Sequence, residues 1–146
     1  MQIAVGTDHA GYEGPPLFKP EIIRHLEERG HRVIDCGPHG PEPVDYPDFA
    51  GRVCRTILDG DAERGVLLCG TGIGMSIAAN RFSGIRAAAC ATPDMARLAR
   101  EHNDANVICL GRRILTLAQC LELIDIWLDT EFSGAERHQR RVTKMG

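Results

Sequence analysis

Residues 65–76 read Gly65-Val66-Leu67-Leu68-Cys69-Gly70-Thr71-Gly72-Ile73-Gly74-Met75-Ser76, an apolar run that leads through alternating glycines into a helical pattern. A short continuous apolar run bounded by glycine is typical of a strand covered on both faces, as in a parallel sheet. The glycines let the backbone turn and approach a ligand, and the first amides of the following helix point outward. The stretch therefore predicts a strand, an anion-binding loop and a helix in direct succession.

The same alternation of short apolar runs and helical segments continues along the whole chain. We expect strands at Gln2–Gly6, Arg32–Asp35, Gly65–Cys69, Ile85–Cys90 and Asn106–Leu110. We expect helices at Leu17–Arg29, Pro47–Asp59, Ile73–Arg81, Pro93–His102 and Leu117–Trp127, and a short last helix at Glu136–Lys144. The order predicts a single-domain, doubly wound (Rossmann-like) α/β/α sandwich with a five-stranded parallel sheet over residues 1–146, in which residues 135–146 form an arm.

Length and composition limit the class of protein. The 146 residues suffice for one domain with a sizeable core. A net charge of −3, with 43% apolar and 25% charged residues, argues against disorder and against a surface built for nucleic acid. Met1 leads directly into an apolar run without the basic segment of a signal peptide, and no apolar run approaches a membrane span. We therefore expect a cytoplasmic protein with neither nucleic acid nor membrane as a partner.

The cysteines do not form a C-x-x-C pair, and most lie within apolar runs: Cys36, Cys54, Cys69, Cys90, Cys109 and Cys120. This pattern is typical of reduced, buried thiols and predicts neither a disulfide framework nor a zinc knuckle. The expected strand ends carry no His, Asp or Glu cluster with metal-ligand spacing. We therefore expect no metal and no cofactor.

In an open α/β sheet, ligands bind outside the carboxyl ends of the strands. Those ends carry Thr7-Asp8-His9, Asp35-Cys36-Gly37, Cys69 to Gly74, Ala91-Thr92 and Gly111-Arg112-Arg113. Helix-end amides beside Cys69 can lower a thiol pKa toward the working pH, which a general base or nucleophile requires. A buried structural cysteine is the alternative interpretation of the same position.

Two further groups of polar residues accompany Cys69. Asp8 and His9 place an acid and a titratable base at the sheet edge, although such a pair can also be a satisfied turn. His102 and Asn103 end the fourth expected helix, where a histidine can simply favour the helix dipole. We expect both groups to converge with Cys69 at the strand ends, which favours a functional site.

The glycine loop does not fit the common nucleotide motifs. No Gly-Lys-Ser/Thr sequence follows it, and Ile77 stands where the dinucleotide fingerprint requires its third glycine. In the tail, Arg137 and Arg141 lie four residues apart with His138 between them, so a helix would cluster them as a phosphate-binding group. A solvated tail is the alternative.

These residues resemble the motifs of the type B ribose-5-phosphate isomerases and their galactose-6-phosphate isomerase relatives. The resemblance covers nearly the whole chain and rests on Asp8-His9-Ala10-Gly11-Tyr12, Asp45-Tyr46-Pro47, Cys69 to Asn80, Gly84-Ile85-Arg86-Ala87, His102 to Val107 and Arg137-His138-Gln139, in this order. It implies a homodimer, or a tetramer, that shares its active sites between subunits and acts on a phosphorylated sugar.

The resemblance also implies a role for each site residue. Cys69 is the base that moves a proton between C1 and C2 through an enediolate, and Thr71 relays protons. His102 opens the sugar ring with support from Asp8. The substrate-binding set is His9, Arg113, Arg137 and Arg141 on the phosphate with His138 nearby, Gly70, Gly72, Ile73, Gly74 and Asn103 on the enediolate oxygens, and Tyr46 and Ser76 as further contacts.

The chain departs from the family pattern after Glu13, where Gly14-Pro15-Pro16-Leu17-Phe18 precedes the first helix and Pro20 falls in its first turn. Because proline fixes φ and delays the helix start, the wall beside Asp8 is expected to change. The substrate is expected to be ribose 5-phosphate, with allose 6-phosphate, galactose 6-phosphate or a tetrose 4-phosphate as alternatives. A nucleotide-binding regulatory module on the same fold is a further alternative from another class.

Overall fold

The computed structural model describes residues 1–146 and contains one five-stranded, fully parallel sheet with the strand order β2-β1-β3-β5-β4. The strands are β1 (Gln2–Thr7), β2 (Arg32–Asp35), β3 (Arg64–Cys69), β4 (Ala87–Ala89) and β5 (Val107–Gly111). The chain reverses its direction of winding between β1 and β3, which are neighbours in the sheet. Their carboxyl ends therefore flank the position at which ligands bind in open α/β sheets.

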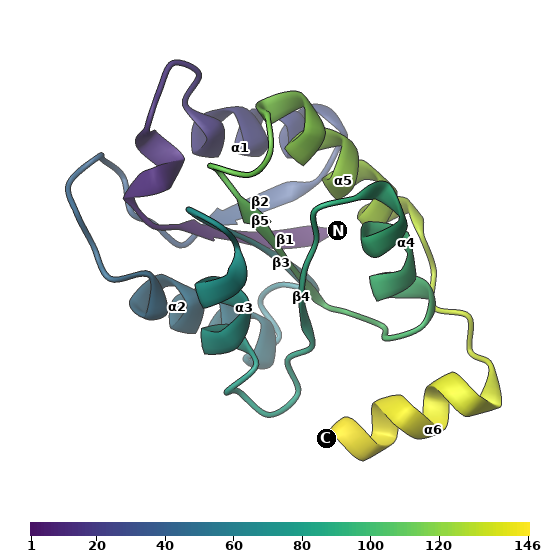
Figure 1. Cartoon of the computed structure of the whole chain (residues 1–146). Helices are drawn as coiled ribbons and strands as arrows, with labels where there is room; N and C mark the ends of the chain where they lie inside the picture. Colours follow the sequence, from purple (N-terminus) through teal and green to yellow (C-terminus); the bar gives the residue numbers. More distant parts are fainter.

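Helices cover both faces of the sheet (Figure 1). They are α1 (Phe18–Glu28), α2 (Tyr46–Leu58), α3 (Ile73–Ala79), α4 (Pro93–Glu101), α5 (Leu117–Asp129) and α6 (Glu136–Met145), with a short 3-10 helix η1 (His9–Tyr12) after β1. One core packs α1, α4 and α5 on the sheet around Phe18, Ile22 and Trp127. The other packs α2 and α3 around Val53 and Met75.

Local sequence explains where several helices begin. The Thr92 hydroxyl accepts a hydrogen bond from the Met95 N–H, and Pro93 occupies the first position of α4, where a missing N–H costs nothing. A complete capping box between Thr116 and Gln119 opens α5. Pro20 lies in the first turn of α1, where proline is tolerated because those N–H groups have no partner within the helix.

The predicted fold class is confirmed: the chain forms an α/β sandwich on a five-stranded parallel sheet. Every expected strand and helix is present, mostly within two residues of its expected ends. β4 is shorter than predicted because Ile85 lies in a turn, where its N–H bonds to Phe82. The 3-10 helix η1 was not predicted, although Asp8 caps it through the Ala10 N–H.

Helix α6 stands apart from the two helical layers and projects from the body, at the yellow end of the chain in Figure 1. Its buried residues are His138 and Val142, while Arg137 and Arg141 are exposed. Residues 136–145 form a helix that meets the body at its first turns, and Met145 and Gly146 at its end line a cavity with residues of the body, so the arm predicted for residues 135–146 stays a prediction. None of the helices combines the length and the apolar character needed to cross a membrane.

Candidate active site

The carboxyl ends of β1 and β3 form the first of two polar clusters, which we call the carboxyl-edge cluster. Asp8 is buried, and its Oδ1 accepts a hydrogen bond from the Ala10 N–H at 2.8 Å. The Val44 N–H donates to His9 Nδ1 at 3.3 Å. Because Nδ1 is the acceptor, the proton of a neutral His9 ring lies on Nε2, which remains a donor for a ligand.

Cys69 ends β3 and lies at the base of the glycine loop. Its side chain is buried, and its Sγ accepts a hydrogen bond from the Gly72 N–H at 3.2 Å. Gly72 has a φ of +81°, and a Cβ there would lie 3.0 Å from the backbone of Leu110. Only glycine fits this turn, which brings the Gly72 N–H against the sulfur.

The other buried thiols have no such environment. Burial raises the pKa of Cys54 and of Cys90 to about 11, and that of Cys120 to about 12. Burial also raises the pKa of Cys109 well above its ordinary value. These four thiols stay protonated at neutral pH and are structural. The predicted free state of all six cysteines agrees with the structure, in which none forms a disulfide.

Three further predicted residues surround the glycine loop. The Tyr46 ring lies over Gly74, where a Cβ would come within 2.7 Å of the ring carbons. The Arg113 guanidinium lies beside Gly70, with its Nη1 3.2 Å from the place of a Cβ there. Ser76, one turn into α3, is half-buried. The structure therefore brings the predicted residues from β1, β3, α3 and the end of β5 to one edge.

The remaining predicted residues form a second group, the amino-edge cluster, at the opposite edge of the sheet. His102 and Asn103 follow α4, which runs back toward the amino end of β5, and β5 begins at Val107. The rings of His102 and His138 stack with their centroids 4.3 Å apart. The expectation that His102 and Asn103 converge with Cys69 at the strand ends is wrong within one chain, because a helix that connects parallel strands ends at the amino edge.

The His138 ring holds the arm to the body. Its Nδ1 lies 2.6 Å from the Ser133 Oγ, and the Ser133 N–H donates to the Glu101 carbonyl at 3.0 Å. Desolvation and the positive charge of Arg137 lower the pKa of His138, so the neutral ring is favoured. Arg137 and Arg141 are on the same helix and remain exposed beside this contact.

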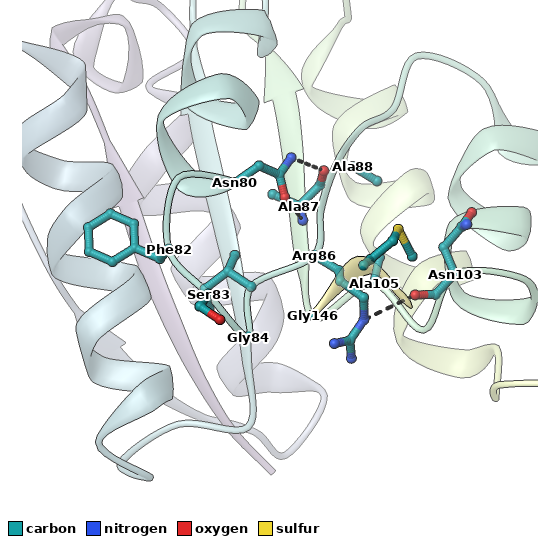
Figure 2. Close-up of a pocket in the computed structure, with 12 residues that line it drawn as sticks. Asn80, Phe82, Ser83, Gly84, Arg86, Ala87, Ala88, Asn103, Ala105 and Gly146 are labelled. Carbon is teal, nitrogen blue, oxygen red and sulfur yellow. Dashed lines mark hydrogen bonds between the residues drawn. The ribbon is translucent and has the colours of Figure 1, made fainter. Parts of the chain in front are cut away.

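Sequence reasoning missed several contacts of both clusters. Glu13 Oε1 pairs with Arg113 Nη2 at 3.0 Å, and the backbone N–H of Val44 orients His9. At the amino-edge cluster, a cavity of about 430 Å³ is lined by Asn80, residues 82–88, Asn103, Ala105 and the end of α6 (Figure 2). No sequence motif marks a backbone donor or a partner from a distant loop, so these contacts become visible only in the folded structure. No three His, Cys, Asp or Glu side chains lie close enough together to form a metal site.

An open α/β sheet with a glycine loop and a polar edge at its reversal point is typical of enzymes that bind a small anionic ligand. The comparisons with known proteins narrow this class. The family model of the Ribose/Galactose Isomerase family matches residues 3–145. Ribose-5-phosphate isomerase B of Escherichia coli K12 is 45% identical over 141 residues, covering 97% of this chain and 91% of that protein.

Solved structures agree with this assignment. Clostridium thermocellum ribose-5-phosphate isomerase B superposes with a TM-score of 0.94 at 50% identity, covering 100% of this chain and 95% of that one. A ribose 5-phosphate isomerase of Thermotoga maritima gives a TM-score of 0.92 at 47% identity, covering 99% and 96%. The chain belongs to the ribose/galactose isomerase family and is therefore a sugar isomerase.

Proposed function

We propose that this enzyme interconverts ribose 5-phosphate and ribulose 5-phosphate through an enediolate, with Cys69 as the base. The observation that carries the proposal is the position of the Cys69 thiol beneath the glycine loop, with the Gly72 N–H on its sulfur. The relatives that share nearly the whole chain are named ribose-5-phosphate isomerase B, which supports this substrate. The cytoplasm is the expected location.

The proposed reaction moves one proton between neighbouring carbons. The Cys69 thiolate takes the proton from C2 of the open-chain aldose, the C–H electron pair forms the C1–C2 double bond, and negative charge collects on O1. The thiol then returns the proton to C1 while a proton passes from O2 to O1, with Thr71 as the relay. Backbone amides of Gly70 to Gly74 stabilise the oxyanion because they are fixed in place before charge develops.

The other predicted residues would bind the phosphate and open the furanose ring. His9 donates from Nε2 to the phosphate, and Arg113 contributes its guanidinium from the loop after β5. Arg137 and Arg141 add two further cations, with His138 between them on α6. His102 opens the furanose ring with support from Asp8, and the Asn103 amide joins the oxyanion site. Tyr46 and Ser76 bound the sugar.

These proposed roles require two chains, because the carboxyl-edge cluster and the amino-edge cluster lie at opposite edges of the sheet. β4 is an edge strand. In a dimer whose twofold axis passes beside β4 and lies perpendicular to the strands, the strands of the two subunits run in opposite directions. The amino edge of one subunit then lies beside the carboxyl edge of the other. Each surface then meets its mate reciprocally and two shared sites form. We therefore propose a homodimer in which His102, Asn103, Arg137 and Arg141 serve the partner's Cys69.

The surface next to β4 has the character of such an interface. Several large apolar side chains there are exposed in the single chain: Ile73, Ile77, Met95 and Ile114. Ile73, Met95 and Ile114 line a groove of about 280 Å³ beside Ala89 and Cys90. A contiguous exposed apolar patch is typical of a surface that another protein covers. The Asn80 amide bonds to both backbone groups of Ala87, so side chains rather than a continuous sheet would form the contact.

A coupled isomerase assay across phosphorylated aldoses of four, five and six carbons tests the proposed activity. Ribose 5-phosphate is expected to give the highest kcat/KM, and activity is expected to survive exhaustive EDTA treatment. A higher kcat/KM on another sugar would reassign the substrate within the family. A loss that added divalent ions restore would replace the metal-free enediolate mechanism with a metal-assisted one.

A further inference from the structure

Asp104 follows the two amino-edge residues His102 and Asn103 and is the only residue other than glycine with a left-handed φ, at 47°. Residues other than glycine rarely adopt this conformation, so the surrounding contacts must maintain it. Asp104 is not assigned a role in the reaction proposed above. The contacts that hold it therefore need an explanation.

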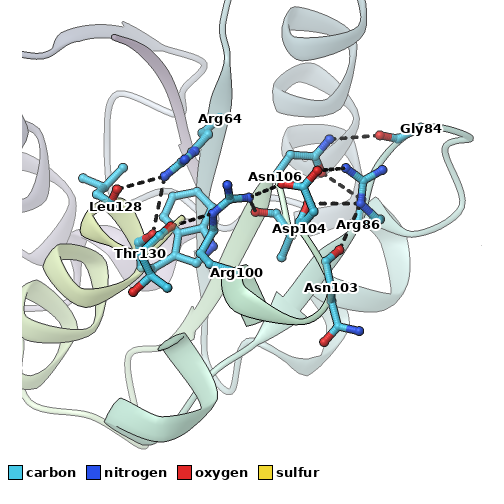
Figure 3. Close-up of polar contacts among 11 residues, drawn as sticks. Arg64, Gly84, Arg86, Arg100, Asn103, Asp104, Asn106, Leu128 and Thr130 are labelled. Carbon is cyan, nitrogen blue, oxygen red and sulfur yellow. Dashed lines mark hydrogen bonds and ion pairs between the residues drawn. The ribbon is translucent and has the colours of Figure 1, made fainter. Parts of the chain in front are cut away.

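Two arginines hold the carboxylate of Asp104 from opposite sides (Figure 3). Arg100 Nη1 donates to Oδ1 at 2.8 Å, and Arg86 Nη2 lies 3.4 Å from Oδ2. The Arg100 side chain is 8% exposed and the Asp104 side chain 34%, so the ion pair is only partly open to water. A carboxylate can accept from two guanidinium groups at once because each oxygen has its own lone pairs.

The same arginines also hold the backbone around this turn. Arg86 Nε donates to the carbonyl of Asn103 at 3.2 Å and to that of Asp104 at 3.0 Å. Arg100 Nη1 donates to the Ala105 carbonyl at 2.8 Å, and its Nε to the Thr130 carbonyl at 3.3 Å. Arg100 thereby connects the turn after α4 to the segment that leads to α6.

Arg86 is itself held in place before it reaches the turn. Its backbone N–H donates to Asn106 Oδ1 at 2.8 Å, and Asn106 Nδ2 donates to the Gly84 carbonyl at 2.9 Å. In Figure 3 the side-chain amide of Asn103 points away from these contacts, while the backbone carbonyl of Asn103 faces Arg86. The backbone of Asn103 is therefore fixed, and its side chain is left free for a ligand.

We infer that Arg86, Asp104 and Arg100 form a clamp whose three members are positioning residues for His102 and Asn103. This inference rests on the roles proposed for those two residues. The clamp does not touch the substrate. It fixes the backbone from which the ring-opening imidazole and the oxyanion-binding amide extend, and displacement of such groups by about an ångström is enough to slow an enzyme.

Two variants and a matched control test the clamp. Asp104→Asn keeps a side chain that tolerates a left-handed φ but replaces one acceptor oxygen with an amide donor that faces a guanidinium. Arg86→Lys keeps the charge but cannot bond to both carbonyls in the fork geometry. The control is Arg97→Lys, because Arg97 lies on the same helix α4 but is exposed and pairs with Glu101.

The first measurement does not depend on activity: hydrogen exchange of residues 100–107. We expect faster exchange in Asp104→Asn and Arg86→Lys than in Arg97→Lys. The second measurement is steady-state kinetics on ribose 5-phosphate, where kcat is expected to fall about tenfold or more while KM changes less than about threefold. A merely structural role would lower the unfolding temperature without this separation of kcat from KM.

The outcomes separate the clamp from the proposed function. Unchanged exchange at residues 100–107 in both variants would show that the clamp does not hold the turn. Faster exchange with kcat within about twofold of the Arg97→Lys control would show that the turn is held but does not position catalytic groups. If the wild-type enzyme isomerises no phosphorylated sugar, the proposed function fails, while the exchange result still decides whether the clamp exists. Should Asp104→Asn not fold, Arg86→Lys carries the same test.

Discussion

The rings of His102 and His138 stack with their centroids 4.3 Å apart and a tilt of 34°. One ring ends helix α4 and the other lies in the first turns of α6, so the stack joins the projecting arm to the body. It also brings a proposed ring-opening residue beside the arginines of α6. The prediction that follows depends on the attachment of the arm at this point.

Acid is expected to loosen the arm. Desolvation and Arg137 lower the pKa of His138 below its unfolded value of about 6.5. The unfolded state therefore binds the proton more readily, and the stability contributed by neutral His138 is present above that value and is lost as the pH falls below it. The protection factors for hydrogen exchange of residues 135–145, which correct each rate for the intrinsic pH dependence of amide exchange, should fall from about pH 7.5 to about pH 5.5.

The variant His138→Asn isolates this effect, because asparagine can still bond to Ser133 but does not titrate. Its protection factors should be nearly independent of pH over the same range. His39→Asn is the control, since His39 is an exposed loop residue whose side chain is 75% accessible. An equal pH dependence in wild type and His138→Asn would assign the acid response to another group.

Cys69→Ala should abolish isomerisation while leaving phosphate binding intact. The change removes the proposed proton carrier but no phosphate contact, so a loss of roughly a thousandfold in kcat is expected. Calorimetry with a non-reactive phosphorylated sugar acid should give a dissociation constant within about threefold of wild type. Cys54→Ala is the matched control, because Cys54 is buried and its raised pKa keeps it protonated. Near-normal turnover in Cys69→Ala would refute the base assignment.

The sequence was sufficient for the sheet, the helices and the carboxyl-edge cluster, because each follows from local patterns. The apolar run ending at Cys69 and the glycines after it predict both a buried strand and an anion-binding loop. The pairing of Arg113 with Glu13 is different, since the two residues lie 100 positions apart and meet only through the fold. The position of His102 was misjudged for a related reason: the family motif that contains His102 does not encode the sheet edge at which this residue lies.

His102→Ala should leave the aldose direction dependent on ring opening in solution. Ribose 5-phosphate closes into a furanose through its C4 hydroxyl, whereas ribulose 5-phosphate stays open because its C5 oxygen carries the phosphate. Without ring opening by the enzyme, only the small open-chain fraction of the aldose is a substrate. As the enzyme concentration rises, the rate from ribose 5-phosphate should therefore level off at the rate of spontaneous ring opening, while the rate from ribulose 5-phosphate stays proportional to the enzyme.

The overall equilibrium constant requires kcat/KM to fall by the same factor in both directions, so the dependence of the rate on enzyme concentration is the diagnostic readout. The measurement is steady rates in each direction over a range of enzyme concentrations, with His25→Ala as a control histidine far along the chain on α1. A rate from ribose 5-phosphate that stays proportional to the concentration of His102→Ala would assign His102 to proton transfer or binding rather than to ring opening.

Shortening the segment Gly14–Leu17 should alter the preference for sugar length more than stability. This loop follows Glu13, which pairs with Arg113, and its prolines line an open cavity of about 750 Å³ beside that arginine. Loops on a rigid scaffold carry specificity at little cost to the fold. Relative kcat/KM across phosphorylated sugars of four, five and six carbons is the measurement. Unchanged ratios would show that the segment is inert.

Mixing two inactive variants should regenerate activity if the clusters of different subunits share a site. Cys69→Ala removes the base from the carboxyl edge, and Arg141→Ala removes a proposed phosphate ligand from α6. In a mixed dimer, one site lacks both residues, and the other contains an intact Cys69 from one chain and an intact Arg141 from the other. Neither variant alone can form an intact site.

The expected yield follows from random pairing of equal amounts. About half of the dimers are mixed and each has one intact site of two, so the recovered activity approaches about a quarter of wild type. Subunit exchange is verified separately by native mass spectrometry with one variant isotopically labelled, and unmixed samples set the baseline. If exchange is complete and activity stays at that baseline, then Arg141 acts within its own chain or not at all, and the pairing of opposite sheet edges across a twofold axis is wrong.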